Sequence, residues 1–335
     1  MLTLAVAACN RAPDAPPKHL VERSRLSMGS ELHLTAWDAD DARTIAAFEN
    51  VFHEIERLDA LMTVWRDTSD IQRLNAAAGG QPVPVSPEVR EVLRMARQIS
   101  DWTDGRFDIT FAALSGLWKF DQDQDDTIPN PDAIRARLQF IDYRTVEVDD
   151  RAGTAFIAKK GVRVNLGGIG KGYAVDRGVA ILRSHGLRDF LIQFGGDMYV
   201  AGQRGDRPWR IGLRDPRGPA DRSFAALDLS NGTFSTSGDY ERAFIKNGRR
   251  YHHILDPATG EPARGCRSVT LVTEQAVVAD ALAKGVFVLG PKEGMALIER
   301  LPNVEGVIVS SQNEVLVSSG LRDRLIRIAD PTDAP

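Results

Sequence analysis

The sequence has 335 residues and a formal net charge of −4, from 42 Lys+Arg and 46 Asp+Glu. This length suits one large domain or two fused lobes, and a hydrophobic fraction of 43% is ordinary for a folded chain. No lysine- and arginine-rich block stands out, so nucleic acid is not an expected partner. No apolar run reaches the roughly 20 residues that a membrane-spanning helix needs.

The N-terminal residues carry a possible export signal. Val6-Ala7-Ala8-Cys9 resembles a bacterial lipobox, in which a signal peptidase cuts before a cysteine that is then lipidated. We expect residues 1–8 to be the remnant of a signal peptide and residues 9–20, which are rich in proline, to be a tether. Met1-Leu2-Thr3 lacks the usual basic segment, so the natural start is expected further upstream. The alternative is a chance cysteine in a frayed terminus.

Apolar periodicity predicts the elements of the first half. Alternation over residues 21–37 predicts an opening strand, interrupted at Met28-Gly29-Ser30. Apolar residues three and four apart predict a long helix over residues 40–62. Two further helices are expected to begin at Ser86-Pro87-Glu88 and at Asn130-Pro131-Asp132, because serine and asparagine cap helices and proline fits the first turn.

Strands dominate the second half. Residues 145–164 predict a strand pair around residues 149–153, and a glycine-dense stretch then leads into a helix ending near Gly186. Strands are expected over residues 190–273, helices over 275–290 and 291–301, and a last hairpin from residues 307–310 and 315–317. This order predicts a mixed α+β fold over residues 21–330, with largely antiparallel sheets packed against helices in one or two lobes.

The glycine-dense stretch is Asn165-Leu-Gly-Gly-Ile-Gly-Lys-Gly172. Glycines allow close approach to a ligand, and the following helix offers free N–H groups and a partial positive charge to a phosphate. Lys171 adds a full charge. The glycine spacing fits neither a Rossmann fingerprint nor a P-loop. The alternative reading is that the glycines only permit tight packing and that Lys171 is solvated.

Other short motifs carry groups suited to catalysis or binding. His253 stands three residues before an Asp-Pro turn, and histidine is the usual general base near neutral pH, although an inert histidine at a strand edge is the commoner case. Asp280 and Lys284 lie four residues apart on one helix face, as an ordinary surface ion pair also would. The remaining motifs are Asp104-Gly-Arg-Phe-Asp-Ile-Thr110 and Phe234-Ser-Thr-Ser-Gly-Asp-Tyr-Glu-Arg242.

Taken in order, these motifs resemble those of the ApbE-type FAD:protein FMN transferase family, from about Ser24 to about Ser310. The quoted matches are Met28-Gly29-Ser30, Leu58-Asp-Ala-Leu-Met-Thr-Val-Trp65, Ser69-Asp-Ile-Gln-Arg-Leu-Asn75, Gly105-Arg-Phe-Asp108, Lys171-Gly-Tyr-Ala-Val-Asp176, Gly195-Gly-Asp197, Thr236-Ser-Gly-Asp239 and His253-Ile-Leu-Asp-Pro257. The resemblance implies an enzyme that cleaves FAD, attaches FMN to a threonine of a target protein through a phosphoester bond and releases AMP. It also implies assistance by magnesium.

The resemblance also implies roles for particular residues. His253 would deprotonate the acceptor threonine, while Gly168, through its backbone oxygen, and Asp280 would bind magnesium. Residues implied to contact FAD are Met28, Trp65, Arg106, Phe107, Asp108, Asn165, Lys171, Ile254 and Leu255. Trp65 stands where the family usually has tyrosine or phenylalanine, and it keeps an aromatic face for stacking. With the lipobox, the resemblance predicts a protein anchored to the bacterial inner membrane and facing the periplasm, whose acceptor is a subunit of a membrane redox complex.

Two departures from the family pattern concern the metal. Asn165 stands where the family usually has aspartate, and Lys284 where it usually has a threonine ligand. A lysine ammonium repels Mg²⁺, which prefers oxygen ligands. We therefore expect a weak or absent magnesium site, with the Lys284 ammonium partly replacing the metal.

The sequence leaves two other functions open. One is FAD hydrolysis to FMN and AMP, since water competes with threonine for the same phosphorus. The other is FAD binding in the periplasm without catalysis. Cys266 is expected to be a bystander thiol, because two cysteines in the whole chain support neither a zinc cluster nor a disulfide framework.

Overall fold

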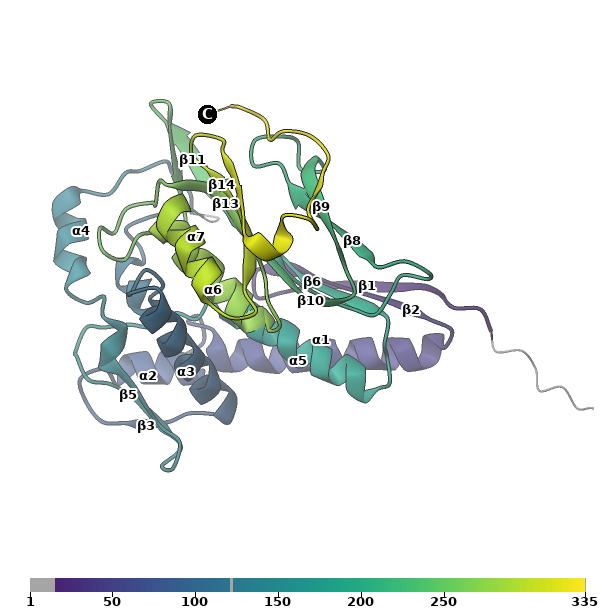
Figure 1. The fold of residues 1–335 in the computed structure, drawn as a ribbon. Helices are drawn as coiled ribbons and strands as arrows, with labels where there is room; N and C mark the ends of the chain where they lie inside the picture. The colour runs from purple at the N-terminus through teal and green to yellow at the C-terminus, as the bar shows by residue number, and fades with distance from the viewer. Residues whose placement is uncertain (1–15, 121–122, 335) are drawn as a thin grey trace, which may run out of the picture.

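The computed structural model describes residues 16–120 and 123–334, and the proposed lipobox at Cys9 lies outside these residues. Figure 1 shows helices layered against a sheet. The main sheet has eight strands in the order β1 (His19–Ser27), β2 (Ser30–Asp38), β6 (Phe190–Phe194), β7 (Asp197–Ala201), β10 (Asn231–Gly238), β13 (Cys266–Val272), β14 (Glu305–Ser310) and β15 (Val315–Val317). Neighbouring strands pair antiparallel throughout, which confirms the predicted class.

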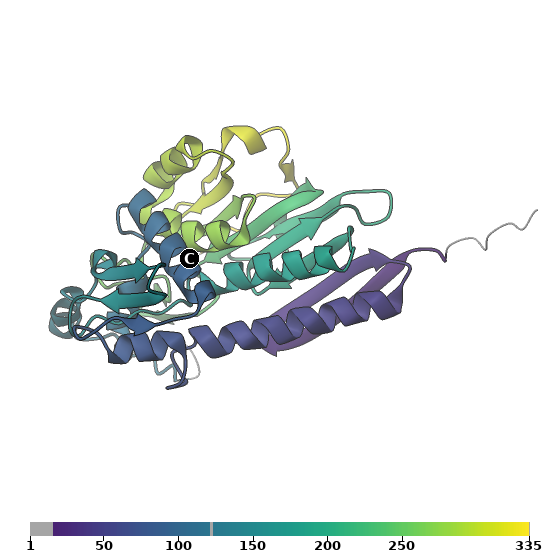
Figure 2. The ribbon, with the colours of Figure 1, turned by 90° about the horizontal axis from the view of Figure 1, so that it is seen from below.

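Helices cover one face of this sheet. The layer is formed by α1 (Asp41–Met62), α5 (Gly170–Ser184) and α6 (Ala276–Leu289), with α3 (Pro87–Trp102) and α7 (Pro291–Arg300) packed against α6. Figure 2 shows α1 running along the β1–β2 hairpin. The helix ends match the sequence signals, since the Asp40 side chain accepts from Arg43 N–H at the start of α1 and Ser86 accepts from Val89 N–H at the start of α3.

A second, smaller sheet covers part of the opposite face. It contains β16 (Ile326–Arg327), β9 (Ser223–Leu229) and β8 (Trp209–Arg214), and its apolar residues pack with Phe234, Val307 and Val309 of the main sheet. Ile308, the residue between the two valines of β14, instead packs with the helices. Strand alternation therefore divides the core into two layers on either side of one sheet.

The remaining elements lie around one end of the main sheet. They are α2 (Asp70–Ala76), α4 (Pro131–Leu138), the small sheet of β3 (Val83–Pro84), β5 (Thr154–Ile157) and β4 (Val146–Asp149), and the hairpin of β11 (Ala243–Lys246) and β12 (Arg249–His252). Short 3₁₀ helices occur at Ile109–Leu114, Tyr143–Thr145 and Ser319–Leu321. No helix among the described residues is both long and apolar enough to traverse a bilayer.

One predicted strand is absent. Residues 162–164 were expected to form the strand before the glycine-dense stretch, yet they adopt no regular structure. The Asn75 side chain replaces a strand partner, because its Oδ1 accepts from Val164 N–H at 2.7 Å and its Nδ2 donates to Val164 O at 3.0 Å. The run thus becomes an irregular segment in which one side-chain amide satisfies the backbone of Val164.

Candidate active site

The glycine-dense stretch forms a turn that ends at the start of α5. The Asn165 side chain stabilises this turn, because its Oδ1 accepts from Gly167 N–H at 2.7 Å. Ile169 precedes the helix, and no side chain caps the helix at that position. The positive end of the helix dipole therefore lies beside the glycines, while the N–H groups of Gly170 and Gly172 donate to Leu166 O and to Asp280.

Lys171, in that first turn, is held by a buried aspartate. Its Nζ lies 3.0 Å from Oδ2 of Asp197 at the start of β7, and Ser235 Oγ donates to Oδ1 of the same carboxylate at 2.6 Å. Although burial opposes ionisation, the Lys171 and Lys284 ammonium groups hold the pKa of Asp197 below its usual range. The charge of Asp197 in turn raises the pKa of Lys171, so the pair is ionised.

Asp280 and Lys284 meet the same helix start from α6. Oδ2 of the fully buried Asp280 accepts from Gly172 N–H at 2.9 Å. Lys284 Nζ donates to the Asp280 backbone oxygen at 2.9 Å and also contacts Oδ1 of the Asp280 carboxylate. Burial and then the charge of Asp197 raise the pKa of Asp280, while both lysines oppose this shift. Two ammonium groups and two carboxylates therefore form one cluster beneath the glycine turn.

His253 directly follows β12, and the charges of Lys284 and Lys171 act on its ring. Its N–H donates to Arg242 O at 3.1 Å, and its ring Nδ1 is buried without a hydrogen-bond partner among the described residues. Burial, followed by the charges of His252, Arg242, Lys284 and Lys171, lowers the pKa of His253 to about 3. The imidazole is thus neutral near pH 7 and able to accept a proton.

The neighbouring residues fix the path of the chain at His253. His252 is buried, and its Nε2 lies 2.8 Å from Ala263 O while its Nδ1 accepts from Ile254 N–H at 3.3 Å. This arrangement assigns a neutral His252 ring with the proton on Nε2. Ile254 is buried in the main core, whereas Leu255 is half-buried and bridges to Pro262.

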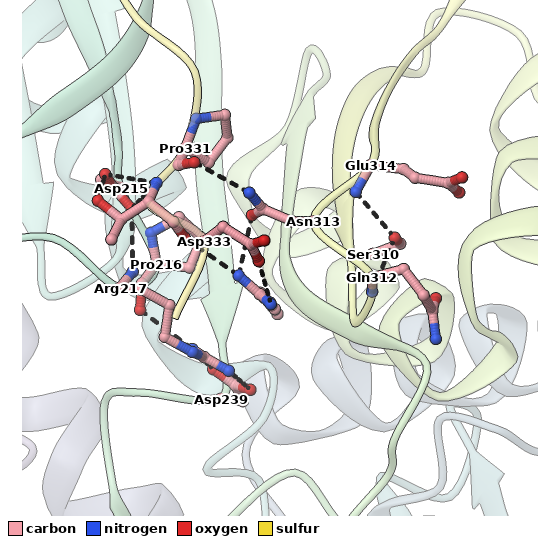
Figure 3. A network of polar contacts seen from close by, with 12 residues as sticks. Asp215, Pro216, Arg217, Asp239, Ser310, Gln312, Asn313, Glu314, Pro331 and Asp333 are labelled. Atoms are coloured by element: carbon pink, nitrogen blue, oxygen red, sulfur yellow. Dashed lines mark hydrogen bonds and ion pairs between the residues drawn. The ribbon is translucent and has the colours of Figure 1, made fainter. Parts of the chain in front are cut away.

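A buried ion-pair network lies near His252. Arg217 donates to both carboxylate oxygens of Asp239, at 2.7 and 2.8 Å, and Asp239 N–H donates to Arg267 O (Figure 3). Arg267 also donates to Asn313 Oδ1 at 2.9 Å. The charge of Asp239 also acts on His252.

Arg106, Phe107 and Asp108 occupy three different environments. Arg106 Nη1 lies 3.2 Å from Asp256 Oδ1, in the turn after His253. Phe107 is buried directly beneath Gly168, where a Cβ would meet its ring at 3.3 Å. The buried Asp108 carboxylate accepts from Thr110 N–H and Oγ1 and from Tyr143 N–H, so its hydrogen bonds are made within the fold.

Met28 and Trp65 come from parts of the chain outside the charge cluster. Met28 has φ of 44°, a left-handed conformation uncommon for a side-chain-bearing residue, at the turn between β1 and β2. The next residues of that turn lie beside Gly195, since a Cβ there would meet Ser30 Oγ at 3.4 Å. Trp65, between α1 and α2, is 90% exposed, and no ring contact joins it to the described chain.

The structure adds two positioning residues that were quoted in motifs but given no role. Asp197 orients Lys171, and Asp176 caps α6 through Ala276 N–H and Val277 N–H at 2.8 and 2.9 Å. Both contacts join segments distant in sequence. Their only sequence signal is an acidic residue near a glycine motif, which does not specify a partner.

Comparison with known proteins places these features in a family. The ApbE family model matches residues 28–308. An FAD:protein FMN transferase from Treponema pallidum is 32% identical over 92% of this chain and 89% of its own length, and one from Klebsiella pneumoniae is 32% identical over 90% and 92%. An ApbE protein from Thermotoga maritima superposes with a TM-score of 0.83 at 31% identity, over 91% of this chain and 99% of that one.

A further solved structure, the flavin transferase ApbE from Vibrio cholerae, has a TM-score of 0.83 at 26% identity and covers 92% of this chain and 100% of its own. The family match thus spans the strand, helix and turn positions that build the charge cluster and carry His253. By sequence and by fold, this chain belongs to the ApbE family.

Proposed function

We propose that this protein is an FAD:protein FMN transferase. It cleaves FAD and attaches FMN through a phosphoester bond to a threonine of a target protein, with release of AMP. The observation that carries the proposal is a neutral, half-buried histidine on which two ammonium groups at a helix N-terminus act, in a chain similar along its length to relatives bearing that name. FAD is the substrate, and the second substrate is a protein.

The chemistry follows from the residues of the site. His253 takes the proton of the threonine hydroxyl as the threonine oxygen attacks the phosphorus of the FMN half of FAD. A new P–O bond forms, the bond between that phosphorus and the bridging oxygen breaks, and AMP leaves with the electron pair. Lys171, held by Asp197, and the first turn of α5 stabilise the negative charge of the phosphates during this step.

The ApbE resemblance implies magnesium held by the Gly168 carbonyl and Asp280, and the residues present do not fit that ion. One oxygen of Asp280 accepts from Gly172 N–H, and the other contacts the Lys284 ammonium. No group of three or more His, Cys, Asp or Glu residues suited to a metal occurs in the described part of the chain. Mg²⁺ requires near-octahedral oxygen ligands. No step above depends on a metal.

We further propose that the protein is lipid-anchored at Cys9 on the inner membrane, facing the periplasm, and that its acceptor is a subunit of a membrane redox complex. The support is the Val6-Ala7-Ala8-Cys9 sequence and the proline-rich segment that follows it. Several acyl chains on one cysteine would give stable membrane attachment. Radiolabelled palmitate incorporation, lost in Cys9→Ser, tests the anchor.

The catalytic proposal is tested by incubating the protein with FAD and a threonine-containing acceptor domain. Covalent fluorescent flavin on the acceptor, together with stoichiometric AMP, is the expected result. Free FMN with AMP and an unmodified acceptor would instead identify an FAD hydrolase. FAD binding with neither product would identify a non-catalytic flavin-binding protein.

A further inference from the structure

Lys284 is placed unlike an ordinary surface lysine. It lies one helical turn after Asp280 on α6, and its side chain is 23% exposed while that of Asp280 is fully buried. An ammonium group has three donors. Two of them reach the backbone oxygen and the carboxylate of Asp280. One donor is therefore available to a ligand at the accessible end of the side chain.

The carbon stem of Lys284 lies against the glycine turn. A Cβ on Gly168 would meet Lys284 Cδ at 3.3 Å and Cε at 3.7 Å, so the side chain runs directly along the glycine turn. The charge of Lys284 also acts on Asp197 and on His253. Lys284 thus belongs to the same electrostatic cluster as Lys171 and the candidate general base.

The charges of the cluster leave little place for a divalent cation. With both carboxylates ionised, Lys171 and Lys284 balance Asp197 and Asp280, so the four side chains sum to zero without any ion. A divalent cation would have to displace the Lys284 ammonium from Asp280 and then lie beside two positive side chains. A diphosphate ester brings one negative charge on each phosphate, and the free donors of the two lysines can donate hydrogen bonds to its oxygens.

We infer that Lys284 is a built-in cation that binds the pyrophosphate of FAD in place of a metal ion, so that FAD binding and cleavage proceed without magnesium. This inference rests on the proposed function for the identity of the ligand. Lys284 contacts a phosphate oxygen through its third donor, while Asp280 holds the ammonium in place. Gly168, having no side chain, leaves room for the Lys284 stem beside the turn.

The test measures FAD binding to the full chain in excess chelator, with flavin fluorescence as the signal. The unmodified protein should bind FAD equally, within about twofold, in chelator and in millimolar magnesium. Lys284→Met should weaken metal-free binding by about tenfold or more, since it removes a charged hydrogen bond. Lys284→Thr should show the same loss in chelator and recover binding with magnesium, because the hydroxyl adds an oxygen ligand beside Asp280. Lys292→Met, on the exposed start of α7, is the matched control and should bind like the unmodified protein.

Two results would overturn the inference: FAD binding by the unmodified protein that requires magnesium, or metal-free binding by Lys284→Met that equals that of the unmodified protein. Calorimetric titration of the unmodified protein with magnesium gives an answer even if a variant does not fold. The absence of binding heat supports the inference, whereas a site that is nearly filled at micromolar magnesium contradicts it.

The transfer assay separates the two proposals. AMP formation only with magnesium removes the inference and keeps the transferase. Metal-free FAD binding that is lost in Lys284→Met, with neither FMN transfer nor AMP in the presence or absence of magnesium, removes the transferase and keeps the binding role of Lys284.

Discussion

Asp176 on α5 and Asp280 on α6 cap each other's helices. Asp176 accepts from the first two N–H groups of α6, those of Ala276 and Val277, and Asp280 accepts from Gly172 N–H in the first turn of α5. Because helix N-termini carry partial positive charge, each carboxylate stabilises the end of the other helix. This reciprocal contact fixes the position of Lys171 relative to Lys284.

Because of Asp176, the folding stability should vary with pH in the mildly acidic range. Burial, the largest cause, raises its pKa to about 6 from 3.8, although the α6 N–H groups favour the ionised form. Because the folded pKa is raised, the protonated carboxyl contributes stability that is fully present below about pH 4 and is lost as pH rises through about 6. The contribution is about 3 kcal/mol at most.

Asp176→Asn removes this titration. Urea denaturation of both proteins between pH 4 and pH 7.5 should therefore show the stability of the unmodified protein falling, relative to Asp176→Asn, as pH rises. A difference between the two proteins that stays constant over that range would contradict the assignment.

Gly172→Ala should destabilise the protein, whereas Gly170→Ala should not. A Cβ on Gly172 would lie 2.3 Å from Ala276 O and 2.7 Å from Asp280 Cβ, which forces α5 and α6 apart. Overpacking of this kind costs about 1–3 kcal/mol. At Gly170, in the same helical turn, no atom lies within 4 Å of a Cβ. Gly170→Ala should be neutral or stabilising by up to about 1 kcal/mol. Thermal and urea unfolding of the two variants measure the contrast, and equal losses would show that helix spacing is not the cause.

Asp197→Asn should lower stability far more than Asp228→Asn. Asp197 is 2% exposed and neutralises the Lys171 ammonium, so its loss leaves a partly buried positive charge without its partner. Breaking such a pair costs about 3–5 kcal/mol. Asp228 pairs with Arg210 in a bidentate but solvent-exposed contact on the smaller sheet, which is worth about 1 kcal/mol or less. Denaturant midpoints at equal m-values decide the comparison, and similar losses would indicate that the Asp197–Lys171 contact is weak.

His253 should act as a neutral base across the ordinary pH range. Because its pKa is lowered to about 3, the imidazole loses its proton well below pH 6. The kcat/KM for AMP release, which reports the free enzyme, should show no decline from His253 between pH 8 and pH 5 and should fall only near pH 3–4.

His253→Ala should reduce kcat by about 10²- to 10⁴-fold while FAD affinity changes little, since general-base catalysis contributes rates of that order. His53→Ala, on an exposed position of α1, is the control and should retain full activity. A decline of kcat/KM near pH 6.5 that disappears in His253→Ala would disprove the lowered pKa of His253. Unchanged kcat in His253→Ala would remove its catalytic role.

Local signals predicted most of the elements. The long helix expected over residues 40–62 is α1, and the serine and asparagine starts at Ser86 and Asn130 are the caps of α3 and α4. The helices expected after Gln275 and at Pro291 are α6 and α7, and the last hairpin is β14–β15. These features depend on the period of apolar residues and on capping groups within a few residues, so the sequence alone specifies them.

Long-range contacts were not predictable in the same way. The strand expected at residues 162–164 was wrong, because a side-chain amide 89 residues away satisfies the backbone of Val164. Asp108, expected to contact FAD, also accepts hydrogen bonds from Thr110 and Tyr143, and its contact with FAD stays a prediction. Nothing in the local pattern distinguishes a carboxylate facing a ligand from one that caps a distant segment.

The sequence by itself determined the helices and strands, the mixed antiparallel class and the family, because these depend on periodicity and on ordered short motifs. Only the tertiary structure decided which charges meet. It brings Asp197 from a strand to Lys171 of α5, and it places the Asp280–Lys284 pair of α6 against Gly172 and Gly168. The physical reason is that the energy of an ion pair depends on distance and burial, and both are set by packing between segments about 26 to 110 residues apart rather than by neighbours along the chain.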